Sequence, residues 1–211
     1  MITMGFRLNG RPCTVVGGGK VSERRIRLLL AEGAELTVIS PKVTAAIAQW
    51  ALEGRLVLYK EPYKAELLGM PRFVIIATDN KAVNEAAAAD ARQLGAFINR
   101  ADVQSECDFT FPASLVMGEL VISIMTGSAS PRLNRLIKQD MINRYEPIKD
   151  VLPRLVELRQ QVKGLLTTPE ERETFWHEQL TAEALELILS GRWKRVEEQI
   201  NNAISSIRLK S

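Results

Sequence analysis

Short apolar runs alternate with helix-like segments through the first hundred residues. The runs read as strands at residues 11–16, 35–40, 55–60, 72–78 and 95–99. Between them, apolar positions recur at a helical period, as from Lys20 to Glu32, and alanines dominate residues 80–94. Strands that alternate with helices predict a parallel sheet with helices on both faces. The first part of the chain therefore predicts an α/β fold of the Rossmann type.

The pattern changes after Asn99. Two strand-like segments flank a turn at Met117-Gly118-Glu119, which predicts an antiparallel pair. From Pro131 onward the pattern is helical, with helices expected at residues 131–146, 147–163, 169–179, 181–190 and 192–207. A small α+β unit and a helical C-terminal part are therefore expected to follow the parallel sheet.

Composition narrows the class of protein. The 211 residues are 46% hydrophobic and 25% charged, as in soluble globular proteins, and the net charge of +3 is too balanced for a general nucleic-acid binder. No apolar run reaches the roughly 20 residues of a membrane span, and the N-terminus lacks a signal-peptide core. Cys13 lies in a core strand, far from Cys107, so free thiols and a cytoplasmic location are expected. A single histidine and no cysteine pair give no reason to expect a metal site.

A glycine-rich turn follows the first strand. Gly17, Gly19 and Ser22 fit the spacing G-x-G-x-x-small, which lets a strand turn tightly into a helix whose N-terminus meets a pyrophosphate. Its position between a strand and a helix is the context that this motif requires. The expected cofactor-binding residues of the turn are Gly17 and Gly19, with Lys20 at the start of the helix. The alternative interpretation is a purely structural turn.

Further candidates follow the other strands, because ligands of open α/β sheets lie beyond the carboxyl ends of the strands. The second strand ends in Ser40-Pro41 instead of the acidic residue that usually binds the adenosine ribose, and Lys42 is close, so the choice between NAD and NADP stays open. Thr78 and Asn80 follow the fourth strand, where they are candidates for hydrogen bonds to a cofactor ribose; Asn80 is also a candidate helix cap.

Two polar segments are candidates for contact with a substrate. The first, residues 99–102, places Asp102 beyond the fifth strand, where it is either a general base or an ordinary loop residue. The second, residues 126–131, precedes a helix that carries Arg132, Arg135 and Lys138. Its small residues, helix N-terminus and cations suit a carboxylate, although Ser130 could equally be a simple N-cap.

Taken together, these motifs resemble those of precorrin-2 dehydrogenases, the NAD-dependent enzymes of siroheme synthesis, and the equivalent N-terminal part of larger siroheme synthases. The resemblance rests on four stretches in their order and spacing: "VVGGGKVSERRIRLLL", "VIIATDNKAVN", "INRAD" and "DFTFPASLVMGELVISIMTGSASPRLNRLIK". Two departures are Ser22, where the family commonly has alanine, and Gly127-Ser128, where it commonly has two glycines.

The resemblance implies a division of the chain and a set of functional residues. It implies an NAD-binding Rossmann domain over residues 1–112, a dimerisation domain over 113–145 and a helical domain over 146–211. The cofactor-binding residues of the family's glycine turn fall on Gly17, Gly18, Gly19 and Val21. The catalytic aspartate of the family falls on Asp102, and the expected substrate-binding residues are Asn99, Ser130 and Arg132.

The activity implied is the NAD-dependent oxidation of precorrin-2, an anionic tetrapyrrole, to sirohydrochlorin by a cytoplasmic homodimer. Some relatives also insert iron into the product, and the sequence leaves that second activity open. The competing hypothesis is a regulatory module that binds NAD and signals through its helical tail.

Overall fold

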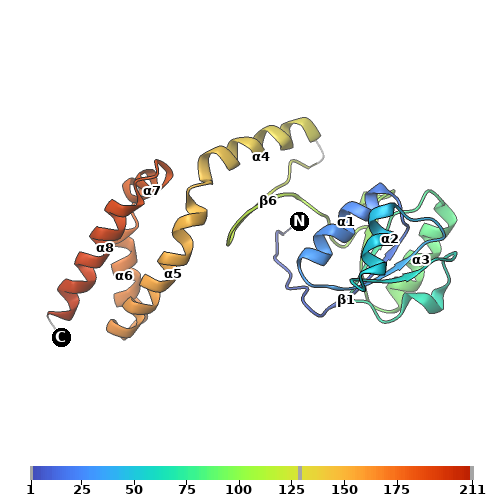
Figure 1. Ribbon diagram of the computed structural model, residues 1–211, viewed down its shortest axis with the longest axis horizontal. Coiled ribbons are helices and arrows are strands. Elements are labelled where there is room, and N and C mark those ends of the chain that lie inside the picture. Colours follow the sequence, from blue (N-terminus) through green and yellow to red (C-terminus); the bar gives the residue numbers. More distant parts are fainter. Residues whose placement is uncertain (1, 128–129, 210–211) are drawn as a thin grey trace. The chain divides into compact units, whose positions relative to one another are not determined.

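The chain folds into two units, Met1–Thr110 and Phe111–Ser211. The computed structural model describes residues 2–127 and 130–209 (Figure 1). None of the helices in this described part is long and apolar enough to cross a membrane.

The first unit is built around a five-stranded parallel sheet with the strand order β3-β2-β1-β4-β5. Its strands are β1 (Pro12–Val16), β2 (Glu35–Ile39), β3 (Val57–Tyr59), β4 (Phe73–Ile76) and β5 (Phe97–Arg100). Its helices are α1 (Lys20–Ala31), α2 (Ala45–Leu52) and α3 (Lys81–Gln93), with short 3-10 helices η1 (Ala65–Leu68) and η2 (Gln104–Glu106). The chain runs outward from β1 to β3, then returns to start β4 on the other side of β1, so the order reverses between β1 and β4.

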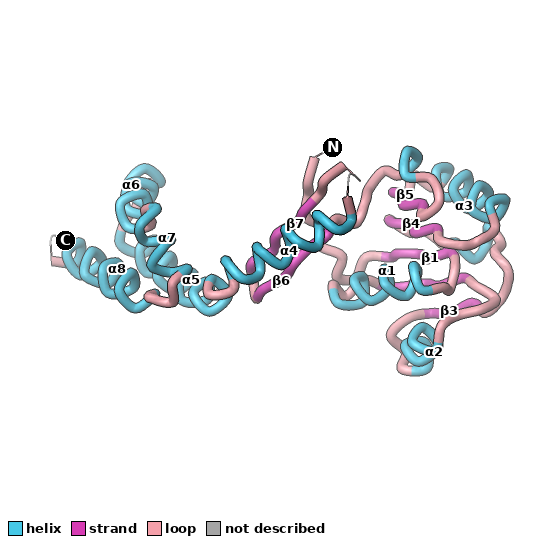
Figure 2. The backbone as a smooth tube through the Cα atoms, turned by 90° about the horizontal axis from the view of Figure 1, so that it is seen from above, coloured by secondary structure: helices cyan, strands magenta, loops and turns pink. Residues whose placement is uncertain are grey.

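Alternation along the strands supplies a core to each face of the sheet. Val16 and Ile76 are neighbours in register and pack on the alanines of α3, whereas Val15 and Ile75 are buried on the opposite face. Small alanines let α3 approach the sheet closely. Figure 2 shows the strands side by side with α3 next to β4 and β5.

The second unit combines an antiparallel strand pair with helices. The pair is β6 (Ala113–Met117) and β7 (Leu120–Ile124), joined at Gly118, whose φ of 59° is the left-handed value that a tight hairpin needs. The helices are α4 (Pro131–Tyr145), α5 (Ile148–Leu165), α6 (Pro169–Gln179), α7 (Ala182–Leu189) and α8 (Trp193–Arg208). Helices α5, α6, α7 and α8 share one apolar cluster, in which Leu158, Val162 and Ile200 are fully buried.

The α/β fold predicted from the sequence is confirmed, including the parallel sheet and the later antiparallel pair. One boundary differs at the site. The fifth strand was expected to end at Asn99, but it continues through Arg100, because this arginine is buried with charged partners instead of being turned to solvent. The division into three domains remains a prediction.

Candidate functional site

The glycine turn lies between β1 and α1, where the strand order reverses. Gly17 has a φ of 116°, and a side chain there would run into the backbone of Ala77 at the end of β4. A side chain on Gly18 would collide with the Lys42 carbonyl and with Ser40 beyond β2. The turn is therefore wedged between two neighbouring strand ends, and only glycine fits its first two positions.

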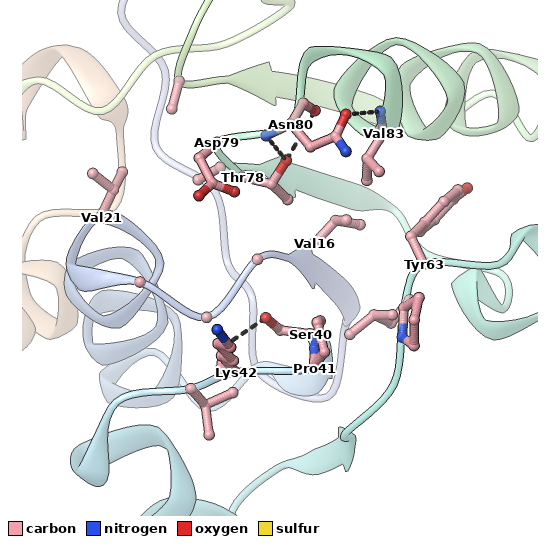
Figure 3. Close-up of a pocket in the computed structure, with 18 of the residues that line it drawn as sticks. Val16, Val21, Ser40, Pro41, Lys42, Tyr63, Thr78, Asp79, Asn80 and Val83 are labelled. Atoms are coloured by element: carbon pink, nitrogen blue, oxygen red, sulfur yellow. Dashed lines mark hydrogen bonds between the residues drawn. The ribbon is translucent and has the colours of Figure 1, made fainter.

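A cavity of about 940 Å³ opens beside this turn (Figure 3). All ten of the expected cofactor-binding and catalytic residues line it: Gly17, Gly18, Gly19, Lys20, Val21, Ser40, Pro41, Thr78, Asn80 and Asp102. They come from four different loops, each beyond the carboxyl end of a strand or at the start of α1. Such a crevice at a switch point is where open α/β sheets bind their ligands.

Two polar walls face each other across the turn in Figure 3. On one wall, the Ser40 hydroxyl donates to the Lys42 carbonyl at 2.7 Å and holds the loop after β2 in place. On the other, the Asn80 side-chain oxygen caps α3 by accepting from the Val83 backbone amide, while the backbone amide of Asn80 donates to the Thr78 hydroxyl. Asn80 is thus the N-cap of α3 and also lines the pocket.

The pocket fits a dinucleotide. Gly19 is the N-cap of α1 and carries no capping side chain, and a Cβ placed on it would meet no atom within 4 Å. The positive end of α1 therefore faces open space at the point where a pyrophosphate would lie. Ser22 is fully buried in the first turn, where a larger side chain would push α1 off the sheet.

Asp102 lies at the edge of this pocket in a tight ionic arrangement. The Arg100 guanidinium donates from Nε to Oδ1 at 3.1 Å and from Nη2 to Oδ2 at 2.9 Å, a two-bond fork. Arg100 is 3% exposed at its side chain, and Asp102 is 29% exposed. The Arg100 hydrogen bonds, with a further one from Asn84, hold the pKa of the Asp102 carboxyl well below its usual range. The group is an ionised carboxylate at every ordinary pH.

The substrate-binding candidates are not among the residues that line the pocket. Asn99 is buried, and its amide donates to the Phe109 carbonyl at 2.8 Å, so in this structure it braces a loop. In the second unit, Ser130 caps α4 by accepting from the Leu133 amide at 3.2 Å, and Arg132 is exposed on its first turn. Within the segment 126–131, residues 128–129 lie outside the described residues. Contact of Asn99, Ser130 or Arg132 with a substrate stays a prediction.

Tyr63, Asn84 and Arg100 were not predicted from the sequence to belong to the site. Tyr63 lines the pocket, and its hydroxyl donates to Asp90 at 2.7 Å. Burial, and then this hydrogen bond, raise the pKa of the Tyr63 hydroxyl. The sequence signal was available, since Tyr63 follows the edge strand β3. Asn84 and Arg100 carried no such signal, because their roles come from partners distant in the chain or hidden at a strand end. Among the described residues, no cluster of three or more His, Cys, Asp or Glu is arranged to hold a metal ion.

Comparison with known proteins identifies the family. The model of a family described as NAD(P)-binding matches residues 4–113, more than half of the chain and all of the pocket. The chain belongs to this NAD(P)-binding family. Membership confirms the expected nicotinamide dinucleotide cofactor. A second model, described as the sirohaem synthase dimerisation region, matches residues 152–204.

Relatives of this NAD(P)-binding chain carry the resemblance further. It is 35% identical over 199 residues to a siroheme synthase of Methylococcus capsulatus, covering 94% of this chain and 42% of that protein. It is 34% identical over 212 residues to siroheme synthase 2 of Aeromonas salmonicida, covering 96% of this chain and 42% of that protein. The chain thus spans less than half the length of these curated relatives.

A solved structure matches over its full length. The protein titled SirC, precorrin-2 dehydrogenase, superimposes with a TM-score of 0.74 at 28% sequence identity, covering 96% of this chain and 100% of that one. The resemblance to precorrin-2 dehydrogenases found in the sequence is therefore confirmed.

Proposed function

We propose that the protein oxidises precorrin-2 to sirohydrochlorin with NAD as the hydride acceptor. The observation that carries the proposal is the Asp102 carboxylate, held by Arg100 at the edge of a pocket that fits a dinucleotide, in a chain similar along its length to a precorrin-2 dehydrogenase. Siroheme synthases among the relatives support the same pathway.

The reaction removes a hydride and a proton from the substrate. NAD supplies the redox chemistry by accepting the hydride with its electron pair. The chain's share is to hold the cofactor at the glycine turn, to align the substrate carbon, and to handle the proton. Lys20 and Lys42 line the same pocket and favour anionic ligands there.

Asp102 is the proposed proton acceptor. With its lowered pKa it is a weak base, so it can take a proton only from an acidic position. Loss of hydride leaves the substrate skeleton positively charged, which makes the neighbouring C–H and N–H groups strongly acidic. A carboxylate that is ionised before the reaction has two roles in this step, because it stabilises the positive charge as it develops and then accepts the proton.

We further propose that the enzyme is a cytoplasmic homodimer whose second unit contributes to substrate binding. The matched dimerisation region supports the dimer. Asn99, Ser130 and Arg132 are the proposed substrate contacts, and the cationic first turn of α4 suits a carboxylate-rich tetrapyrrole. The free thiols of Cys13 and Cys107 suit a reducing compartment.

An absorption assay tests the proposal. The purified protein is mixed with anaerobic precorrin-2 and NAD, and the spectra of sirohydrochlorin and NADH are followed together. We expect both products in equal amounts. NAD binding without any change in precorrin-2 would instead indicate a sensing module. Adding ferrous iron after completion tests iron insertion, since siroheme has a spectrum of its own.

A further inference from the structure

The Asp102 carboxylate is held by two buried polar side chains from two different elements. Arg100 at the end of β5 takes both carboxylate oxygens, and Asn84 of α3 donates from Nδ2 to Oδ2 at 3.0 Å. Arg100 is 4% exposed and Asn84 is 2% exposed, although both residue types normally face water. Burial of this kind is stable only when the polar groups are satisfied.

Arg100 is fixed from both sides. Its Nη1 donates to Glu106 at 2.8 Å, and Glu106 also accepts from Arg92 on α3 at 3.0 Å. The backbone amide of Arg100 donates to the Cys107 thiol at 3.1 Å. One edge of the planar guanidinium thus donates to Asp102 and another to Glu106. A lysine ammonium cannot reproduce this geometry.

Asn84 ties the two strand-end loops of the pocket together. Its amide nitrogen donates to the Thr78 carbonyl at 3.2 Å as well as to Asp102, and its amide oxygen accepts from the Thr78 hydroxyl at 2.6 Å. The full hydrogen-bonding capacity of the amide nitrogen is therefore used between the loop after β4 and the loop after β5.

We propose that Arg100 and Asn84 are positioning residues that fix the Asp102 carboxylate, in its ionised form, at the edge of the dinucleotide pocket. The proposal rests on the function proposed above for Asp102. Neither residue lines the pocket, so neither is expected to touch the cofactor. Their effect reaches the reaction only through Asp102 and, for Asn84, through Thr78.

The charges around Asp102 set the expected pH behaviour. Arg100 is the adjacent cation, while Glu106 shares that cation and Arg92 partly offsets Glu106. From the other loops, Asp79, Lys20 and Lys42 line the same pocket. Since the Arg100 contact is the only direct ion pair of Asp102 among the described residues, loss of its fork should make the carboxylate easier to protonate.

The direct test is an NMR titration that needs no substrate. Protein with ¹³C-labelled aspartate carboxyls gives six signals, and the one missing in Asp102→Asn is assigned to Asp102. We expect wild-type Asp102 to remain ionised below about pH 3.9, the ordinary aspartate value. In Arg100→Lys, its titration midpoint should move up by about 1–3 pH units. An ordinary midpoint in the wild type, or no movement in Arg100→Lys, would overturn the proposal.

Two further variants guard the titration. Asn84→Ala keeps the arginine fork but removes one hydrogen bond, so it should move the midpoint up by less; if Arg100→Lys does not fold, an unmoved midpoint in Asn84→Ala overturns the proposal. Arg92→Gln is the matched control, because it removes an exposed arginine from Glu106 without touching the Asp102 fork. It should leave the Asp102 titration in place.

A kinetic arm connects the positioning to turnover. In Arg100→Lys, kcat should fall by about a hundredfold, as expected for a displaced reacting group, with the acid limb of its pH profile moved upward and the KM for NAD unchanged. Wild-type turnover with identical profiles in the variants would sink the positioning roles alone. No turnover in the wild type would sink the proposed function, while the NMR result would still decide how Asp102 is held.

Discussion

At the scale of single residues, the proposed chemistry depends on the charge state of Asp102. Its lowered folded-state pKa means that the carboxylate is ionised across the neutral and mildly acidic range. Because the folded value lies below the unfolded one, the arrangement stabilises the protein above about pH 3.9 and loses that contribution as the pH falls toward the folded-state pKa. Turnover should therefore show no acid limb from Asp102 between neutral pH and about pH 4, which a kcat–pH profile checks.

Replacing the carboxylate itself gives the sharpest change. Asp102→Asn keeps size and polarity but removes basicity and charge, so we expect turnover to fall by at least about a hundredfold, within the range typical of positioned general bases. Fluorescence titration should find NAD affinity retained. Asp150→Asn, an exposed aspartate at the start of α5, is the control and should turn over normally. Near-normal turnover in Asp102→Asn would make Asp102 an ordinary loop residue.

The end of β2 predicts weak discrimination between the two nicotinamide dinucleotides. Among the described residues that line the pocket, no carboxylate comes from the loop of Ser40 and Lys42, so nothing there repels a 2′-phosphate. We expect calorimetry to give NADP an affinity within about tenfold of that for NAD, a difference of roughly 1.4 kcal/mol. Lys42→Glu should lower the affinity for NADP and leave the affinity for NAD unchanged. Strong rejection of NADP by the wild type would contradict this reading of the loop.

Residues that follow strand ends could be found from the sequence, whereas those that hold them could not. Asp102, Thr78 and Ser40 were predictable because a parallel sheet gathers its carboxyl ends at one edge. Arg100 resembles a loop residue in the sequence, and its burial depends on Asp102 and Glu106 being folded around it. In the sequence, Asn84 looks like an ordinary polar position on α3. Its role depends on the fold, which brings Asp102 of the loop after β5 within hydrogen-bonding distance.

At the scale of elements, substitutions at two glycines of the turn should have different effects. Gly19→Asp adds a side chain into open space, so the fold should survive, while the negative charge at the start of α1 should abolish NAD binding. Gly18→Ala forces a Cβ against the Lys42 carbonyl and should lower the melting temperature. Thermal melts and NAD titrations separate the two effects. Unchanged NAD affinity in folded Gly19→Asp would refute the placement of the pyrophosphate.

The start of α4 offers a modest element-scale prediction. Ser130 accepts the Leu133 amide, so Ser130→Ala should cost about 1 kcal/mol of stability, as measured by denaturant unfolding. Ser130→Asp keeps a capping oxygen and should restore that stability. If Ser130 also contacts the substrate, Ser130→Ala will raise the KM for precorrin-2 beyond what Ser130→Asp restores.

Element types were predicted well because the periodicities are strong, and the misplaced end of β5 has a local cause. Apolar runs such as the one through Val74 can only be buried strands in this alternating context, and the glycine after Met117 marks a hairpin. Arg100 broke the apolar run by its charge, yet it continues the ladder opposite Ile76. The end of β5 therefore depends on the ion pairs of Arg100 with Asp102 and Glu106, which the hydrophobic periodicity of the sequence does not reveal.

At the scale of the whole molecule, the second unit exposes apolar side chains that a partner subunit could bury. Val116 and Val121 are a cross-strand pair, 67% and 59% exposed, and Leu133 and Leu136 of α4 are also exposed. A two-stranded sheet with one helix buries little by itself. We therefore expect sedimentation to find a dimer at micromolar concentration, and Val116→Glu to weaken it.

A matched substitution sharpens the dimer test. Val57→Glu changes a valine of similar exposure, 54%, on β3 of the first unit and should leave the dimer intact. A dimer that survives Val116→Glu would place the contact outside residues 113–145, with 152–204 as the next segment to test. A monomeric wild-type protein would contradict the proposed homodimer.

The proposed reaction is the oxidation of precorrin-2 by NAD in this pocket, with Asp102 as the proton acceptor. A single-turnover experiment tests it most directly: enzyme in excess over anaerobic precorrin-2 with saturating NAD, read by the absorption of sirohydrochlorin and NADH. We expect one NADH for each sirohydrochlorin in the wild type and at least about a hundredfold slower formation of both in Asp102→Asn. Precorrin-2 left unchanged by the NAD-bound wild-type protein, or formed into product equally fast by Asp102→Asn, would contradict it.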